Sequence, residues 1–439
     1  MSLMAELSFI YFALPMALAV YLVFPPSLRA GALLVISAVY FLLAEPVLAV
    51  VMLVGVTADF AILHAMEKYG EDAGIRRGCL VFSLVKSLGL IAAFGGLLDG
   101  FGGGVYTALG LYVVTFSGFG CTLSRFRGKL PGRVNPVHFM LYCLFFPRLA
   151  VGPLIAYHDF VPQLKSPNPS ISEIMQGGSL VIKGAAKFIL LGEPLADLHM
   201  MLRFMPHGEV SVLGGWLVPI VLMMSVYLRF AGVADIARGC AKMMGILLPQ
   251  NFSHPLGAES VRDFFTRFNS TLTDYVARLF GKNLAGGAIC LMATGIFMGL
   301  WFGISWGRLG WGIFLGAFLI FEFYLYPDFF ERVPGVVRRV YTLTILVLSF
   351  VIFDAGSISQ IKLNLSYMLG IGGIALWSDR LWYLLSSNRL VLLVSLLFFT
   401  DTLRQIHLFL RDKVGRIAYT TFRAFGSILL LALLSAFWV

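Results

Sequence analysis

Long apolar runs separated by short polar loops dominate the amino-acid sequence. They recur at residues 9–24, 31–43, 46–63, 80–97, 104–119, 137–146, 212–226, 284–306, 310–325, 342–353, 390–399 and 425–439. A helix needs about 20 residues to cross the hydrocarbon core of a membrane, and shorter runs are typical of re-entrant or buried segments. The pattern therefore predicts an all-α polytopic membrane protein with roughly ten to twelve transmembrane helices in a single domain that covers residues 1–439.

Proline and glycine interrupt this apolar pattern at membrane depth in two places. The first is the stretch 146–148 followed by Gly152-Pro153, and the second covers residues 232–245. Non-helical backbone inside a membrane is tolerated only where protein or a water-filled cavity satisfies its hydrogen bonds. We therefore expect either re-entrant or pore-lining segments here, or simple helix kinks.

A charged, amphipathic segment covers residues 259–282, where charged side chains are interleaved with aromatic and aliphatic ones. This pattern is typical of a helix that lies in the membrane surface with its apolar face toward the lipid. We expect one interfacial helix or a pair of them in this segment.

The composition agrees with solvation by lipid. The chain has 439 residues, of which 59% are hydrophobic and 13% are charged, whereas about 25% of the residues of a soluble domain are charged. The first apolar run lacks a basic segment and an obvious small-residue cleavage site, so we expect it to be a retained anchor. The five cysteines form no C-x-x-C pair, and we expect small packing residues there rather than disulfides, a metal site or a cofactor site.

The net charge of +10 comes from Lys and Arg that gather in short loops. These residues are Arg76, Arg77, Arg125, Arg127, Lys129, Arg133, Arg404, Arg411, Lys413 and Arg416. An excess of Lys and Arg in short loops marks the cytoplasmic side and attracts anionic membrane lipid. The charges are dispersed between apolar runs and form no continuous face, so nucleic-acid binding is not expected.

Four blocks of sequence, in order, carry a resemblance to a known family. Residues 40–46 read Y-F-L-L-A-E-P, similar to F-Y-A-W-G-E-P, and residues 145–164 follow F-F-P-x-L-x-x-G-P-I-x-R-Y-x-D-F-x-P-Q-L closely. Residues 230–252 resemble F-S-G-Y-S-D-M-A-x-G followed by G-x-x-x-P-x-N-F, and residues 263–322 form the fourth block. A weaker echo at 350–355 resembles W-V-F-F-R-A. These patterns resemble the bacterial branch of the membrane-bound O-acyltransferase (MBOAT) family, which includes membrane proteins of alginate O-acetylation and teichoic-acid D-alanylation.

The resemblance implies an MBOAT-like bundle of transmembrane, re-entrant and interfacial helices in a bacterial cytoplasmic membrane. It also implies a tunnel or pocket, to which we assign Pro147, Gly152, Pro153, Asp235, Asn251, Trp301, Trp306 and Glu322. Asp235 would be costly to bury without a partner such as Arg229 or Arg238, so we expect it to stabilise the second interruption. Glu322 is an ionisable group in an apolar run, which suggests either a functional site or a place at the membrane edge.

The departures from the family pattern fall on its histidines. The family's R-R-W-H-x-S-L is similar to residues 266–272 with Asn269 at the histidine position, and its W-H-G reads Trp301-Phe302-Gly303 here. A third histidine, in W-G-x-x-H-G, is replaced by Leu315. Acyl transfer to a hydroxyl needs a base that can take its proton, and the loss of such a base typically slows a reaction about 10²–10⁴-fold. Asparagine, phenylalanine and leucine cannot take that proton.

The sequence therefore supports three hypotheses. The first is a catalytically inactive homologue that serves as scaffold or partner subunit, together with another protein, in an assembly that modifies or exports a surface polysaccharide. The second is an active O-acyltransferase for an exported polysaccharide with a relocated base, for which His254 and His158 are the candidates. The third is a conduit for lipid or polysaccharide.

Overall fold

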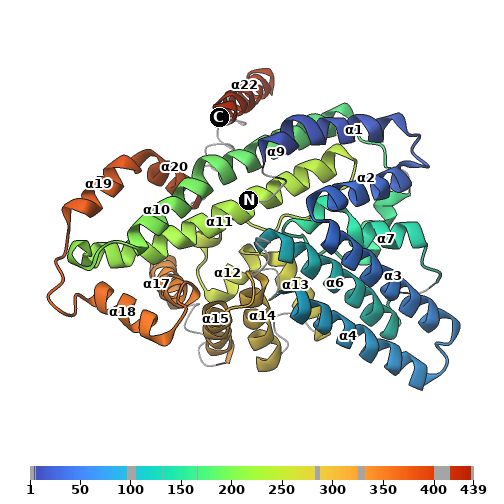
Figure 1. Cartoon of the computed structure of the whole chain (residues 1–439), viewed down its shortest axis with the longest axis horizontal. Coiled ribbons are helices and arrows are strands. Elements are labelled where there is room, and N and C mark those ends of the chain that lie inside the picture. Colours follow the sequence, from blue (N-terminus) through green and yellow to red (C-terminus); the bar gives the residue numbers. More distant parts are fainter. Residues whose placement is uncertain are drawn as a thin grey trace. The chain divides into compact units, whose positions relative to one another are not determined.

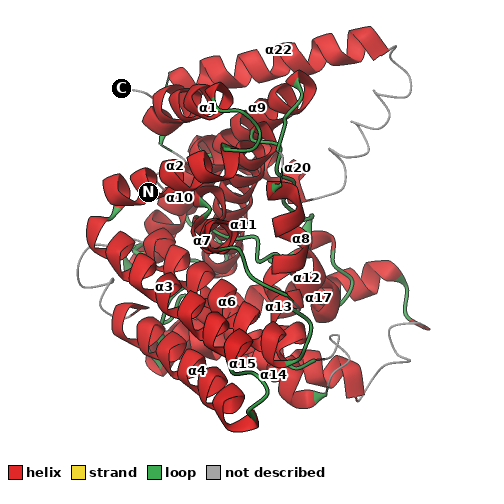
Figure 2. Ribbon diagram, turned by 90° about the vertical axis from the view of Figure 1, so that its right-hand side faces the viewer, coloured by secondary structure: helices red, strands yellow, loops and turns green. Residues whose placement is uncertain are grey.

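The computed structural model describes residue 4 and residues 6–95, 105–130, 132–165, 167–281, 287–324, 332–399 and 416–436. The basic residues Arg404, Arg411 and Lys413 lie outside these ranges. Within the described ranges the chain consists of helices joined by loops (Figure 2), and one isolated β-bridge joins Phe252 to Phe268. The chain divides into two compact units, Met1–Val181 with Val233–Gln250, and Ile182–Gly232 with Asn251–Val439. The single-domain organisation stays a prediction.

The first unit contains the N-terminal helices (Figure 1). They are η2 Phe9–Ala13, α1 Leu14–Val23, α2 Arg29–Ala44, α3 Pro46–Lys68, α4 Ala73–Gly95, α6 Val105–Phe126, α7 Pro136–Leu144, η3 Phe146–Leu149, α8 Tyr157–Phe160 and η4 Val161–Leu164. Two further helices, α9 Ile171–Ala185 and α11 Val212–Met243, have residues in both units.

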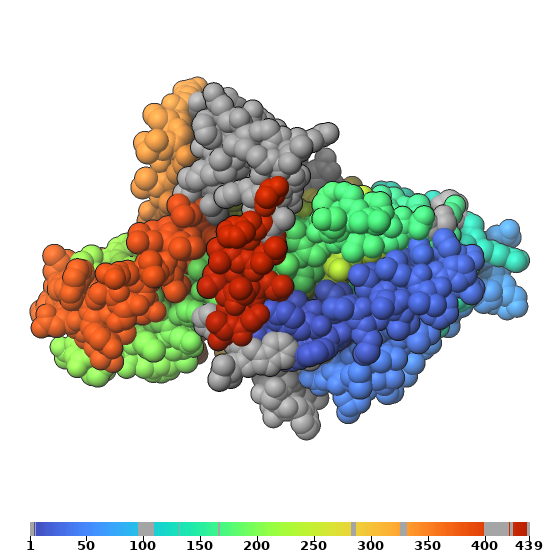
Figure 3. All heavy atoms as spheres, turned by 90° about the horizontal axis from the view of Figure 1, so that it is seen from above, coloured from blue at the N-terminus to red at the C-terminus, as the bar shows by residue number. Residues whose placement is uncertain are grey.

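The second unit contains the remaining helices. They are η5 Ala186–Gly192, α10 Glu193–Arg203, η6 His207–Glu209, η7 Pro255–Gly257, α12 Val261–Arg267, α13 Ser270–Leu279, α14 Ala288–Trp301, α15 Trp306–Tyr324, α17 Gly335–Phe353, α18 Ile358–Leu369, α19 Asp379–Ser387, α20 Arg389–Phe399 and α22 Arg416–Ser435. In Figure 3 the orange segment that contains α19 lies beside the light-green N-terminal end of α11, where Val212 N–H donates to the Ala375 carbonyl oxygen at 3.0 Å.

Several helices are long and apolar enough to cross a membrane, which confirms the all-α polytopic membrane class. Among the described residues these are Pro46–Lys68, Ala73–Phe94, Ile171–Arg203, Val212–Met243, Trp306–Tyr324 and Gly335–Phe353, and the bent pair formed by Asp379–Ser387 and Arg389–Phe398 would add one more. Shorter apolar helices cover Phe9–Val23, Arg29–Ala44, Ala288–Trp301 and Phe425–Ser435. The expected number of ten to twelve spans stays a prediction.

The first predicted interruption is confirmed. After α7 the chain forms the short helix η3 and then runs without helix from Gly152 to Ala156. The Arg148 side chain is buried here. Its guanidinium donates hydrogen bonds to the carbonyl oxygens of Tyr142 and Pro153. It also donates to the Ser117 hydroxyl. Because a buried charge is tolerated only when its donors are satisfied, this cation stabilises the broken backbone around it.

The second predicted interruption, at residues 232–245, is not a re-entrant or pore-lining break, because α11 continues as a helix to Met243 and only the last two residues lie beyond it. A Cβ atom on Gly239 would lie 2.6 Å from the Gly177 carbonyl oxygen, and one on Gly232 would lie 2.6 Å from the Gly184 carbonyl oxygen. Glycine is present here because neighbouring helices approach too closely for a side chain, as is common in membranes. Asp235 has one of its two expected partners, because its carboxylate pairs with Arg238 at 3.2 Å.

The tightest helix contact in the second unit that bears on the candidate site joins α14 to α15. Gly295 and Gly299 on α14 face Gly312 and Gly316 on α15, so that a Cβ atom on Gly295 would lie 2.8 Å from the Gly316 Cα atom. Pairs of glycines four residues apart allow two helix backbones to touch within a membrane. The close contact determines where the chain that links the two helices must turn.

We expect Gly295→Ala to push α14 away from α15 and to lower the free energy of unfolding by about 1–3 kcal/mol, the usual cost of overpacking. The measurement is the thermal unfolding midpoint of the purified full chain in detergent. Gly89→Ala is the matched control, because a Cβ atom on Gly89 would meet nothing within 4 Å. Equal midpoints for the two variants would contradict the close approach of these helices.

Candidate functional site

The Trp301-Phe302-Gly303 motif lies at the turn between α14 and α15. Phe302 N–H donates to the Gly299 carbonyl oxygen at 3.2 Å, and Gly303 N–H donates to the Leu300 carbonyl oxygen at 3.0 Å. Gly303 has φ +110°, a backbone conformation that favours glycine. The turn buries Trp301 and Phe302, whereas the side chain of Trp306, at the start of α15, is exposed.

Aromatic rings surround the Phe302 side chain. The centroid of its ring lies 4.8 Å from that of Phe230, 5.4 Å from that of Phe353 and 5.9 Å from that of Trp311. Phe268, at the end of α12, lies 6.1 Å away. We call these five residues the Phe302 cluster. Edge-to-face contacts at such distances stabilise a packed core beyond the burial of area alone, so the position that resembles a family histidine is part of an apolar core.

Asn269 occupies the link between α12 and α13, in the left-handed conformation with φ +51°. Asparagine adopts this conformation more readily than most residues. Its buried side-chain oxygen accepts a hydrogen bond from the Asn251 side-chain amide at 2.8 Å. Asn251 in turn accepts from the Thr271 hydroxyl at 2.7 Å. Asn269 and Asn251, both assigned to the site from the sequence, therefore lie together in a buried amide pair.

Leu315, the third position that resembles a histidine, is completely buried on α15, one turn after Trp311 of the Phe302 cluster. With Asn269 and Phe302, it makes all three positions neutral and buried. None of these three side chains can accept a proton at ordinary pH.

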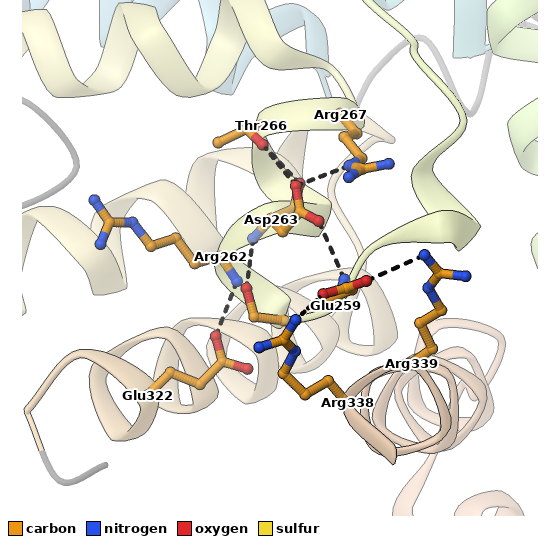
Figure 4. Close-up of polar contacts among 9 residues, drawn as sticks. Glu259, Arg262, Asp263, Thr266, Arg267, Glu322, Arg338 and Arg339 are labelled. Carbon is orange, nitrogen blue, oxygen red and sulfur yellow. Dashed lines mark hydrogen bonds and ion pairs between the residues drawn. The ribbon is translucent and has the colours of Figure 1, made fainter. Parts of the chain in front are cut away.

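Glu322 holds α12 against α15 (Figure 4). Its two buried carboxylate oxygens accept hydrogen bonds from Val261 N–H at 2.8 Å and Arg262 N–H at 3.0 Å. The Ser260 hydroxyl caps the same helix end by accepting from Asp263 N–H at 2.9 Å. A carboxylate at a helix N-terminus satisfies unpaired backbone donors and opposes the positive end of the helix dipole. Glu322 thus has a structural role, and its assignment to a tunnel stays a prediction.

Glu259 links this helix end to α17. Its carboxylate forms ion pairs with Arg338 and, at 3.1 Å, with Arg339 (Figure 4). Its backbone N–H donates to Asp263, which pairs with Arg267 at 2.8 Å. The hydrogen bond from Arg338 holds the pKa of Glu259 below its ordinary value of 4.5. The sequence pattern showed that these charges exist but not that they pair across helices far apart in the chain.

The expected pair of helices in residues 259–282 is confirmed as α12 and α13, but their predicted contact with lipid is wrong. The apolar side chains of both helices are buried within the protein. They are Val261, Phe264, Phe265, Phe268, Leu272, Tyr275 and Val276. Phe268 belongs to the Phe302 cluster and Phe264 stacks on it at 4.9 Å, so these buried rings are not available to the membrane surface. An amphipathic pattern alone does not show whether the apolar face of a helix packs against lipid or against the rest of the protein.

The remaining assigned residues divide between the two units. Pro147, Gly152, Pro153 and Asp235 belong to the first unit, as does His158, an exposed side chain whose Nε2 atom lies 3.4 Å from the Asp159 carboxylate. His254 belongs to the second unit and is half-buried, with φ +47°. Its Nδ1 atom lies 3.3 Å from the Phe398 carbonyl oxygen.

Sequence reasoning missed Phe230 and Phe353 as neighbours of Phe302. Both stand near the end of an apolar run, beside a charged residue or a glycine. An apolar run that ends in this way indicates the end of a helix. It does not show which other helix packs against that end.

The charge pairs of Glu259 generate a pH dependence. Because the folded pKa of Glu259 is lowered, its contribution to stability is fully present above about pH 4.5 and is lost as the pH falls through the lower, folded value. We expect Glu259→Gln to lower the thermal unfolding midpoint at pH 7. When the pH is then lowered below 5, the midpoint of this variant should fall less than that of the unaltered chain. Glu71→Gln, on an exposed loop, is the control. Parallel pH profiles for the unaltered chain and Glu259→Gln would refute the role of this pair.

Comparison with known proteins finds relatives among membrane acyltransferases, although no family model matches the chain. The "Probable alginate O-acetylase AlgI" of Pseudomonas aeruginosa is 25% identical over 254 residues, which cover 56% of this chain and 48% of the relative. The "Peptidoglycan O-acetyltransferase" of Helicobacter pylori is 25% identical over 255 residues, covering 54% and 48%. The "Teichoic acid D-alanyltransferase" of Bacillus subtilis is 27% identical over 225 residues, covering 47% and 56%.

The chain spans about half the length of the curated relatives it matches. The names of these three relatives describe the acylation of alginate, of peptidoglycan and of teichoic acid, respectively. The resemblance found in the sequence motifs is therefore confirmed: this multi-pass membrane protein is similar to bacterial acyltransferases of the MBOAT family.

Proposed function

We propose that this chain is a catalytically inactive MBOAT homologue, which serves as scaffold or partner subunit of an assembly that modifies or exports a surface polysaccharide. The observation that carries the proposal is the Phe302 cluster. A position that resembles the family's catalytic histidine is filled by a phenylalanine ring packed against Phe230, Phe353 and Trp311.

The chemistry of acyl transfer explains why this observation matters. A base must lie within hydrogen-bond reach of the accepting hydroxyl and take its proton as the new ester forms. Phe302 offers no lone pair, Asn269 already accepts the Asn251 amide, and Leu315 is aliphatic. The rings of Phe230, Phe353 and Trp311 that pack on Phe302 offer no base in its place.

The context of the proposal comes from the relatives. Their names place acyltransferases of this kind at alginate, peptidoglycan and teichoic acid. A related chain without the bases is suited to hold such an assembly in a bacterial cytoplasmic membrane. Its function would then be to bind membrane lipid and the protein partners of the assembly. The number and identity of its protein partners are part of the proposal.

One observation favours a second candidate, an active O-acyltransferase that uses His254. This half-buried imidazole follows the β-bridge between Phe252 and Phe268, and Asn251 of the amide pair lies three residues before it. A base at His254 would therefore stand in the same part of the second unit as the positions that resemble the family histidines. His158 is exposed and belongs to the first unit.

An assay of acyl transfer distinguishes the two candidates. We expect membrane vesicles that contain the full chain to transfer no more radiolabel from acetyl-coenzyme A to purified envelope polysaccharide of the source organism than vesicles without it. His254→Ala and His158→Ala are measured in parallel and should not change this background. Transfer that depends on the chain and disappears in His254→Ala would replace the first candidate by the second.

Restoring the histidines tests whether only the base has been lost. Phe302→His would place two ring nitrogens among aromatic side chains, and an unsatisfied buried polar group costs about 1–3 kcal/mol. We therefore expect the variant with Phe302→His and Asn269→His to remain inactive and to unfold at a lower temperature than Phe302→Leu. Acyl transfer by the double variant, at an unchanged unfolding midpoint, would show a pocket that still fits the substrate and would contradict a closed core.

A further inference from the structure

A cavity of about 290 Å³ lies in the second unit, lined by residues outside the Phe302 cluster. Its walls come from the end of α10, the start of α11, the end of α17 and one face of α18. No motif of the sequence analysis predicted it, although Asp354, one of its lining residues, stands where the weak family echo has an arginine.

A charged pair forms one wall of the cavity. The Arg203 guanidinium pairs with the Asp354 carboxylate, and its Nη2 atom also donates to the Asp354 backbone carbonyl oxygen at 3.1 Å. Behind the pair, the buried His199 places Nε2 3.5 Å from the Asp354 carboxylate and Nδ1 3.3 Å from the Val218 carbonyl oxygen. A guanidinium carries five N–H donors, so these two bonds leave donors that can face a ligand.

Hydrogen-bonding side chains of α18 form another wall of the cavity. Gln360 accepts Gly356 N–H at 2.8 Å through its oxygen, which leaves its amide N–H groups as donors. Asn364 lines the cavity, and its side chain has no hydrogen-bond partner among the residues that the structure describes. The Tyr367 hydroxyl, also on this wall, contacts the His207 ring. The cavity therefore offers a cation, a carboxylate and two amides.

The cavity lies at the ends of helices that are candidates to span the membrane. The candidate span Ile171–Arg203 ends at it, Val212–Met243 begins at it, and Gly335–Phe353 ends next to Asp354. In Figure 1 these ends of α10 and α11 lie close to α18 and α19. The ends of spanning helices lie at the depth of the lipid headgroups.

Exposed apolar side chains surround the cavity at this depth. The Phe204 and Leu363 side chains line the cavity and are exposed, and Trp377 and Trp382 are exposed on the following segment. Tryptophan gathers at membrane interfaces, where its ring meets both apolar and polar surroundings. The surface around the cavity is therefore suited to lipid chains.

We infer that this cavity binds the headgroup of a membrane phospholipid whose headgroup carries hydrogen-bond donors beside its phosphate. The phosphate would accept from the Arg203 guanidinium, the geometry that arginine favours for such anions. A headgroup hydroxyl or ammonium would donate to the Asp354 carboxylate and the Asn364 amide oxygen, while the acyl chains lie along Phe204 and Leu363. The inference does not depend on the proposed function.

The experiment uses the full chain, purified in detergent and freed of lipid. Phosphatidylglycerol, phosphatidylethanolamine and phosphatidylcholine with identical acyl chains are added separately, and native mass spectrometry measures the bound fraction. We expect the first two to bind at least about tenfold more tightly than phosphatidylcholine, whose headgroup donates no hydrogen bond. Free glycerophosphoglycerol, which has no acyl chains, is the soluble arm and should not displace the lipid.

Two variants and a control locate the binding. The variant with Arg203→Gln and Asp354→Asn removes both charges together, and Asn364→Ala removes an amide without breaking a hydrogen bond, so it remains informative if the first variant fails to fold. Both should lose the preference over phosphatidylcholine, whereas Lys362→Gln, an exposed cation on the same helix outside the cavity, should keep it. Equal binding of the three lipids, an equal loss in Lys362→Gln, or displacement by glycerophosphoglycerol would overturn the inference.

Discussion

The second unit depends on the backbone contact between α14 and α15. Gly295, Gly299, Gly312 and Gly316 remove the side chains that would hold these helices apart. Within lipid, where apolar side chains gain little by leaving the solvent, such close contact is a main source of helix association. Because the two helices touch, the chain between them must turn sharply at Gly303. This turn directs Phe302 into the protein and leaves Trp306 on the surface.

Polar groups in both units follow a second constraint, that a charge out of water must be paired or solvated by the protein. The Glu322 carboxylate is solvated by the first N–H groups of α12, which donate hydrogen bonds to it. The Arg148 guanidinium is solvated by backbone carbonyl oxygens, to which it donates. Asp59 on α3 pairs with Lys86 on α4, and Gly118 on α6 leaves room for this pair. In each case a polar side chain fixes the position of backbone or of a neighbouring helix, which apolar packing alone does less specifically.

The sequence was sufficient to predict the class of fold and the positions of most helices, because long apolar runs have one physical explanation. It also placed the interruption after α7 correctly, since proline and glycine there leave no continuous helix. It failed at residues 232–245, because glycine is used both to end a helix and to let another helix approach, and composition does not separate these uses. It failed again at α12 and α13, whose apolar face has a protein partner that only the folded chain reveals.

At the candidate site, too, the sequence alone predicted the positions of residues but not their contacts. Motif spacing identified Asn269, Phe302 and Leu315, but the contacts that give them meaning come from Phe230, Asn251 and Phe353, which lie far away in the chain. The cavity beside Asp354 was not predicted, because its residues come from three helix ends and one face of α18, with no common motif. Long-range pairing of this kind is not encoded in any local pattern of the sequence.

The conformation of Asn269 is consistent with the proposal that this chain keeps the backbone of the family site without its base. Its backbone is left-handed, and histidine and asparagine are both enriched there relative to other residues. An exchange of histidine for asparagine at this link therefore preserves the turn between α12 and α13 while it removes the proton acceptor. At Phe302, the second position that resembles a family histidine, the side chain packs against four aromatic neighbours. Selection for the turn and the packing, without selection for a base, would leave this combination of residues.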